Sequence, residues 1–184
     1  MDKKKLYLII SLSILGLGVF LNFRKKNKFI GRNIIIGDSH AVGISKLLKN
    51  VEKSTCAVGG WMVNNLIQCI SNQPVQTDVA NVFISIGTNG LYSSNDKIEQ
   101  LIQLLQQKFP NATFYVYGGS YGWSGSMTNS QVESRRNQYY KRFSDKSVIL
   151  LKNGLGYFKT DAEAHSINTP QAKAIAQEIN SLSS

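Results

Sequence analysis

Three polar side chains that lie far apart along this sequence form the set that acyl transfer requires. Ser39 supplies a hydroxyl, His165 an imidazole, and Asp161 a carboxylate four residues before that histidine. A serine attacks a carbonyl efficiently when a base takes its proton, and the base needs a third group to fix its orientation. These three residues are therefore candidates for a catalytic triad. Glu163 is the alternative acid, and an ordinary loop histidine is the alternative interpretation of His165.

Ser39 lies at the boundary between an apolar run and a helical pattern. Residues 33–36, Asn-Ile-Ile-Ile, are typical of a strand buried on both faces. Gly37 and Asp38 interrupt this run, and apolar residues then recur at helical spacing from 42 to 48. A serine at such a strand-to-helix turn is raised above the sheet edge, as a nucleophile is, although GxSxG is absent. The alternative is that Asp38 or Ser39 serves only as a helix N-cap.

The negative oxygen that forms at an attacked carbonyl needs hydrogen-bond donors already in place. The candidate donors for this oxyanion hole are the backbone N–H groups of Ser39 and Gly60 and the side-chain amide of Asn89, with Gly59 less favoured than Gly60. The alternative for both glycines and for Asn89 is simple turn chemistry. His40, the only other histidine, adjoins Ser39; we expect it at the surface of the helix start, poorly placed to act as the base.

Alternating strand and helix patterns set the positions of these residues. The predicted strands are residues 33–36, 54–58, 79–86, 113–117 and 148–151, and the predicted helices are residues 40–48, 62–70, 94–108, 131–143 and 169–182. Strands that alternate with helices imply an α/β fold with a parallel sheet and helices on both faces. Because ligands of such sheets bind at the carboxyl ends of the strands, the candidate residues are expected to meet at that edge.

The polar segments occur in the order found in the SGNH hydrolases, also called the GDSL family, which this sequence resembles. The matching segments are GDSH at 37–40, CAVGG at 56–60, SIGTNG at 85–90 and DAEAHSIN at 161–168. The resemblance implies a flavodoxin-like three-layer α/β/α sandwich with about five parallel strands in the order 2-1-3-4-5. It also implies ester hydrolysis through an acyl-enzyme at Ser39, without a metal or other cofactor.

Two positions depart from the family pattern. Gly90 stands where the family usually has an aspartate that takes no part in catalysis, and Ala162 occupies the position three before the histidine, where the family has its acid. Asp161 and Glu163 lie on either side of that position. The displaced acid keeps open a second class of function, a non-catalytic structural or glycan-binding module anchored in a cell or virion membrane.

Residues 118–130 form a glycine- and serine-rich segment after the predicted fourth strand. Tyr121 and Trp123 within it are candidates for contact with a sugar ring or a short acyl chain, and the alternative is that these aromatic side chains cap the core. The expected substrate is an acylated carbohydrate or lipid of a cell envelope, with deacetylation of a surface glycan preferred.

The positive charge of the chain gathers around an apolar segment near its start. Residues 1–32 hold eight of the 21 Lys and Arg residues and one of the 11 acidic residues, which leaves only +3 of the net +10 for the rest. This distribution argues against nucleic acid as a partner and favours membrane lipid. Residues 6–23 carry no charge, and as a helix they would rise about 27 Å, barely enough to cross a bilayer core.

We therefore predict a single-pass signal anchor at residues 1–26, a basic tether at 27–32 and one SGNH-like domain at 33–184 on the outer side of the membrane. A cleaved signal peptide is the alternative. Cys56 and Cys69 fit neither a metal motif nor a disulfide framework, so two buried free thiols are expected, one in a strand and one in a helix.

Overall fold

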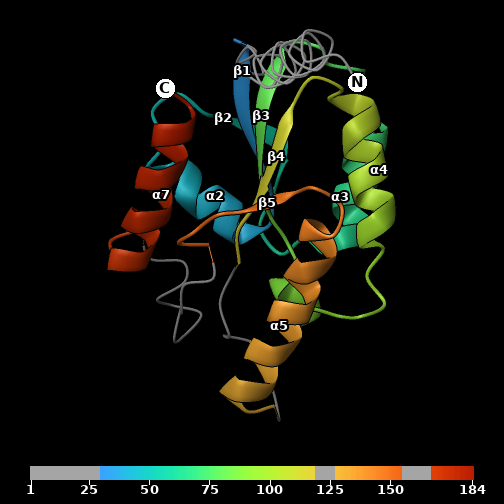
Figure 1. Ribbon diagram of the computed structural model, residues 1–184, viewed down its shortest axis with the longest axis vertical. Helices are drawn as coiled ribbons and strands as arrows, with labels where there is room; N and C mark the ends of the chain where they lie inside the picture. The colour runs from blue at the N-terminus through green and yellow to red at the C-terminus, as the bar shows by residue number, and fades with distance from the viewer. Residues whose placement is uncertain (1–29, 119–126, 155–166) are drawn as a thin grey trace, which may run out of the picture. The chain divides into compact units, whose positions relative to one another are not determined.

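Five parallel strands form one sheet at the centre of the protein (Figure 1). The computed structural model describes residues 30–118, 127–154 and 167–184. The strands are β1 (Arg32–Gly37), β2 (Glu52–Ala57), β3 (Val79–Ser85), β4 (Thr113–Val116) and β5 (Ile149–Leu150), in the order β2-β1-β3-β4-β5. Every neighbouring pair is parallel, which confirms the predicted α/β class and strand order. The order reverses next to β1, and open parallel sheets bind their ligands at such a reversal.

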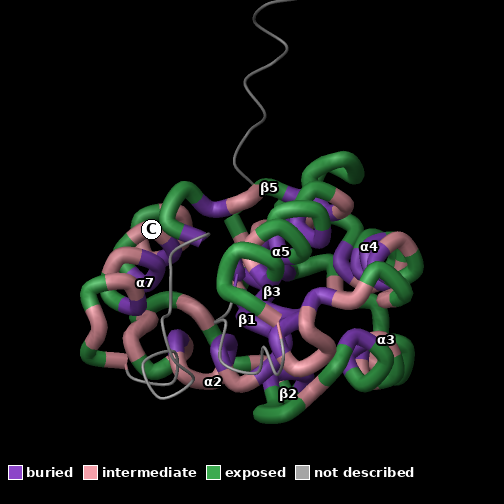
Figure 2. The backbone as a smooth tube through the Cα atoms, turned by 90° about the horizontal axis from the view of Figure 1, so that it is seen from below, coloured by how far each residue is buried: buried purple, intermediate pink, exposed green. Residues whose placement is uncertain are grey.

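Helices cover both faces of this sheet, so the domain has three layers. The helices are α2 (Ser39–Ser45), α3 (Val63–Ser71), the short 3₁₀ turn η1 (Thr88–Gly90), α4 (Ile98–Lys108), α5 (Asn129–Ser144) and α7 (Pro170–Leu182). Figure 2 shows α2 and α7 on one side of the strands and α3, α4 and α5 on the other. Residues Gly31–Ser184 form one compact unit.

The side-chain alternation of β1 connects the two halves of the core. Ile34 and Ile36 pack into the cluster that α3, α4 and α5 complete, whereas Ile35 packs into the cluster with α2 and α7. Successive side chains of a strand point to opposite faces, so an uninterrupted apolar run suits a strand covered on both sides. All seven residues of β3, the central strand, are buried for the same reason.

The first helix is shorter than its apolar pattern predicts. It ends at Ser45, and the N–H groups of Lys46 and Leu47 donate to carbonyls only three residues back, those of Gly43 and Ile44. The chain therefore tightens into turns before Leu48 instead of continuing as an α-helix.

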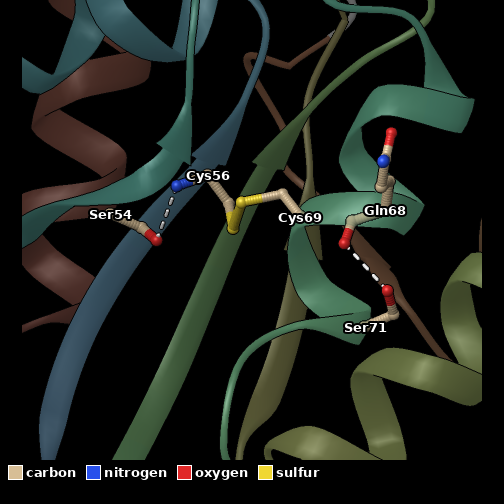
Figure 3. Close-up of a disulfide and its surroundings, with 5 residues drawn as sticks. All are labelled: Ser54, Cys56, Gln68, Cys69 and Ser71. Carbon is tan, nitrogen blue, oxygen red and sulfur yellow. Dashed lines mark hydrogen bonds between the residues drawn. A yellow bond between two sulfur atoms is a disulfide. The ribbon is translucent and has the colours of Figure 1, made fainter.

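The expectation of two free thiols was wrong, because Cys56 and Cys69 form a disulfide (Figure 3). Cys56 lies near the end of β2 and Cys69 near the end of α3, with a Cα–Cα distance of 5.7 Å. The glycine turn after β2 sends the chain back so that α3 lies beside that strand. The secondary-structure placement of each cysteine was correct, but the pattern of two isolated cysteines contained no information about this return.

Among the described residues, no helix has the length and apolar character needed to cross a lipid bilayer. The predicted anchor at 1–26, with its uncharged stretch at 6–23, lies outside the described residues, as do residues 27–29 of the predicted tether.

Candidate active site

The turn that carries Ser39 is built on a close approach between β1 and β3. Gly37, the last residue of β1, has a φ of 129°, and a Cβ there would overlap the carbonyl oxygen of Ser85. The N–H of Asp38 donates to that same carbonyl oxygen at 2.8 Å. Glycine is therefore required at position 37, because it alone has no Cβ to fill the space and tolerates this backbone conformation.

The N-cap of α2 is Asp38, so Ser39 is not used as the cap. The Asp38 side chain is buried and accepts a hydrogen bond from the N–H of His40 at 3.0 Å. The hydroxyl of Ser85 also donates to Asp38 Oδ1, at 3.2 Å. Ser39 is the first residue of the helix and is half-buried. Of the two sequence alternatives for this turn, the capping role thus belongs to Asp38 alone.

The prediction that His40 lies at the surface was wrong, because only 2% of this residue is exposed. Its helix packs on β1 and β2, and its carbonyl oxygen accepts a hydrogen bond from the buried hydroxyl of Tyr117. Burial, and next the charge of Asp38, raise the pKa of Tyr117 well above its ordinary value, so this hydroxyl stays protonated. The first turn of α2 is therefore tied to the core beneath it.

The second candidate segment lies beside the first. The N–H of Val58 donates to the carbonyl of Gly37 at 3.0 Å, which joins the ends of β2 and β1. A Cβ placed on Gly59 would lie 3.9 Å from the Cβ of Ser39. Gly60 follows with a left-handed φ of 79°, and a Cβ there would meet no atom within 4 Å. The glycine turn therefore runs past Ser39 while its outer side stays open.

The third candidate segment reaches the same place from β3. Asn89 lies in η1, and its side-chain amide donates to the carbonyl oxygen of Trp61 at 3.0 Å. Gly87, with a φ of 117°, begins this turn, and a Cβ there would approach the ring of Tyr139 to 2.7 Å. The structure thus brings Ser39, the Gly59–Trp61 turn and Asn89 together at the carboxyl ends of three adjacent strands.

A polar cluster that sequence reasoning missed supports the turn of Asn89 from outside. The Tyr139 hydroxyl donates to Asp96 Oδ2 at 2.9 Å, and this carboxylate oxygen lies 3.5 Å from where a Cβ of Gly90 would be. Burial raises the pKa of Asp96, while the hydrogen bond from Tyr139 and the charge of Arg142 oppose that rise. Asp96 and Tyr139 are 43 residues apart, and nothing in the local sequence pattern pairs them.

Arg142 ties the chain beyond this turn to α5. It donates to both carboxylate oxygens of Glu99, at 3.0 and 2.6 Å, and to the carbonyls of Ser94 and Asp96. The hydrogen bonds from Arg142 lower the pKa of Glu99 to about 2. Tyr140 adds a hydrogen bond from its hydroxyl to the carbonyl of Ile86 at 2.9 Å.

The predicted base and its acid lie outside the described residues. His165, Asp161 and the alternative acid Glu163 belong to residues 155–166, and the candidate substrate contacts Tyr121 and Trp123 belong to residues 119–126. The described chain shows where these segments begin. The N–H of Gly118, after β4, donates to the carbonyl of Gly154, after β5, so both segments begin from adjacent backbone.

Within 30–118, 127–154 and 167–184, no group of three or more His, Cys, Asp or Glu side chains is arranged to hold a metal ion. The described residues place the Ser39 hydroxyl beside the Gly59–Trp61 turn and the turn of Asn89, both of which carry N–H donors. Such an arrangement suits the stabilisation of an oxyanion next to a nucleophile.

Solved structures of lipases and acylhydrolases share this fold, and one of them is described as a GDSL-like lipase. Phospholipase A1 from Streptomyces albidoflavus matches with a TM-score of 0.57 and 13% identity over 83% of this chain and 99% of its own. A GDSL-like lipase from Bacteroides thetaiotaomicron matches with a TM-score of 0.56 and 10% identity, over 83% of this chain and 87% of its own. A lipase/acylhydrolase from Enterococcus faecalis matches with a TM-score of 0.55 and 11% identity, over 83% of this chain and 94% of its own.

No family model and no curated protein matches the sequence. The structural likeness therefore shows the fold alone, an α/β fold shared with these lipases. At 10–13% identity it does not by itself assign an activity to this chain.

Proposed function

We propose that this protein is a serine ester hydrolase of the SGNH type that works through an acyl-enzyme. One observation carries the proposal. Ser39 begins the helix after β1, with the Gly59–Gly60 turn on one side and Asn89 held to that turn through the Trp61 carbonyl. A nucleophile and hydrogen-bond donors thus meet at the edge where parallel sheets bind their ligands.

In the proposed reaction, the Ser39 hydroxyl oxygen attacks the ester carbonyl, and His165 accepts its proton and returns it to the leaving alkoxide. Asp161, or Glu163 in its place, orients the imidazole. The N–H groups of Ser39 and Gly60 and the amide of Asn89 stabilise the oxyanion. Water then attacks the acyl-enzyme carbonyl while His165 takes a proton from it, the bond from the acyl group to the Ser39 oxygen breaks, and the proton passes to that oxygen.

The hydrogen bond from Asn89 to Trp61 supports the role proposed for Asn89. A side-chain amide has two N–H donors, and one of them is used on the Trp61 carbonyl at 3.0 Å. That bond fixes the plane of the amide and leaves the second N–H for a substrate oxygen. A donor fixed in this way needs no rearrangement as charge develops in the transition state.

We propose an acylated carbohydrate or lipid of a cell envelope as the substrate, with an acetylated surface glycan preferred. The disulfide between Cys56 and Cys69 supports a location outside the reducing cytosol, because structural disulfides persist in oxidising compartments. The uncharged residues 6–23 with basic flanks are the proposed membrane anchor. Tyr121 and Trp123 are the proposed contacts to the sugar or acyl group.

The test is hydrolysis of p-nitrophenyl acetate together with labelling by a fluorophosphonate probe. We expect Ser39→Ala to abolish labelling and acyl-enzyme formation, and Asn89→Ala to raise the barrier by about 2.7–4 kcal/mol, a loss of about 10²–10³ in kcat. Ser45→Ala is the matched control, because Ser45 lies on the same helix and its hydroxyl donates to the Val42 carbonyl of that helix. Equal rates for wild type and Ser39→Ala would overturn the proposal.

The displaced acid before His165 favours the second candidate, a non-catalytic structural or glycan-binding module. The same experiment separates the two functions. A folded wild type that the probe does not label, and that hydrolyses nothing above the Ser39→Ala background, is the result expected of such a module.

A further inference from the structure

We infer that the Cys56–Cys69 disulfide is a positioning element of the active site, because it holds the turn that carries the Gly60 N–H donor against Ser39 and Asn89. This inference rests on the proposed function, since it assigns a role in the same reaction. Neither cysteine is proposed to touch the substrate.

The disulfide closes a short loop around the glycine turn. The two cysteines are 13 residues apart, so the closed segment holds residues 57–68, including Gly59, Gly60 and Trp61. Cys56 is fully buried near the carboxyl end of β2, and Cys69 is on α3 (Figure 3). The bond therefore fixes the distance between the strand that enters the turn and the helix that leaves it.

The closed loop touches both of the other candidate segments. On one side, a Cβ on Gly59 would lie 3.9 Å from Ser39 Cβ. On the other side, the Trp61 carbonyl accepts the Asn89 amide at 3.0 Å. A shift of α3 relative to β2 would move the donor turn past the nucleophile and would also release the partner that fixes Asn89.

The turn has few other ties that could replace the disulfide. Gly59 and Gly60 have no side chains, and the flanking Val58 and Met62 are 37% and 50% exposed. Among the described residues, the other ties are the packing of Trp61 on the core, the hydrogen bond from Asn89 to the Trp61 carbonyl, the backbone bond from Val58 to Gly37, and the bonds that Met62 makes with the first turn of α3. Because glycine is the most flexible residue, a turn with two adjacent glycines needs its ends held if its N–H groups are to keep one direction.

The experiment replaces the disulfide and measures p-nitrophenyl acetate hydrolysis at 25 °C in the full chain. In Cys56→Ala/Cys69→Ala we expect kcat to fall about tenfold, a fraction of the effect of losing a donor, with KM changed less than about twofold. Cys56→Val/Cys69→Ala fills the core at position 56 but lacks the disulfide. If the first variant does not fold, kcat is measured in this second variant instead. Val79→Ala is the stability control, because Val79 is buried at the amino end of β3, away from the site.

Combination with Asn89→Ala distinguishes positioning from stability. If the disulfide also fixes Asn89 through the Trp61 carbonyl, its removal in the Asn89→Ala background should lower kcat by less than the tenfold expected in the wild-type background, because only the effect on the Gly60 donor remains. Fully additive losses would overturn the part assigned to Asn89, and a kcat no lower than that of Val79→Ala at matched stability would overturn the inference as a whole.

Amide hydrogen exchange gives an answer that does not depend on activity. Removal of the disulfide should speed exchange at the hydrogen-bonded N–H groups of Val58 and Leu66, at the two ends of the turn, while α4 stays protected, and equal protection of these groups in both proteins would refute the inference. A wild type without any Ser39-dependent hydrolysis would refute the proposed function, and the exchange data would still decide whether the disulfide orders the turn.

Discussion

Two kinds of glycine turn meet at the carboxyl edge of this sheet. At Gly37 and Gly87 a Cβ would collide with the Ser85 backbone or with the Tyr139 ring, so packing leaves the chain a single course. At Gly60 a Cβ would meet nothing within 4 Å, and only the positive φ requires glycine. Packing against the core thus fixes the backbone of the turns that place Ser39 and Asn89; we call these turns locked. No atom packs closely against Gly60, and we call the Gly59–Gly60 turn open. The comparison agrees with the positioning role inferred above for the disulfide, which lies beside the open turn.

Among the variants that test this comparison, Gly37→Ala is expected to lower the stability of the protein the most. The new methyl group would overlap the Ser85 carbonyl at a φ of 129°, so β1 and β3 would have to separate. We expect the free energy of unfolding to fall by more than about 4 kcal/mol, measured by denaturant titration.

Gly43→Ala is the matched control for that variant. Gly43 lies inside α2, and a Cβ there meets nothing within 4 Å. Alanine at this helical position should leave stability unchanged or raise it by up to about 1 kcal/mol. A Gly37→Ala protein as stable as the Gly43→Ala protein would show that the turn before Ser39 is not locked as described.

Gly60→Ala should have an intermediate effect. The left-handed conformation of an alanine is unfavourable by about 1–2 kcal/mol, but no neighbouring atom has to move. We therefore expect a loss of about that size in the same titration, clearly below that of Gly37→Ala. Losses of equal size at the two positions would remove the distinction between locked and open turns.

Glu99→Gln should have the smallest effect, and it tests the polar support behind the turn of Asn89. Arg142 lowers the pKa of Glu99 from 4.5 to about 2 in the folded protein, so the unfolded chain takes up the proton first as the pH falls. The stability from this pair is therefore present above pH 4.5 and is lost between about pH 4.5 and 2.

The Glu99 side chain is 47% exposed, so solvent screens the pair and its contribution should stay below about 1 kcal/mol at neutral pH. Thermal melts of wild type and Glu99→Gln at pH 7 and pH 3 check this expectation. The difference in Tm between the two proteins should be smaller at pH 3 than at pH 7, because part of the contribution is lost by pH 3, and a constant difference would show that the ion pair does not contribute.

The sequence by itself determined the order of the elements and the identity of the candidate turn residues. The strand at Ile34–Ile36 followed from its uninterrupted apolar run, and the parallel sheet followed from the strict alternation of strands and helices. These features depend on local composition and period, which a linear pattern contains. The prediction that Ser39, Gly60 and Asn89 share one edge followed from the same topology, because parallel strands end together.

Tertiary structure alone decided three further features: the burial of His40, the pairing of Cys56 with Cys69, and the bond between Tyr139 and Asp96. Each depends on how closely separate elements approach. His40 is buried because its helix lies on the sheet, and the two cysteines meet because a turn with two glycines brings α3 back beside β2. Such distances arise from the packing of whole elements, which no single stretch of sequence specifies.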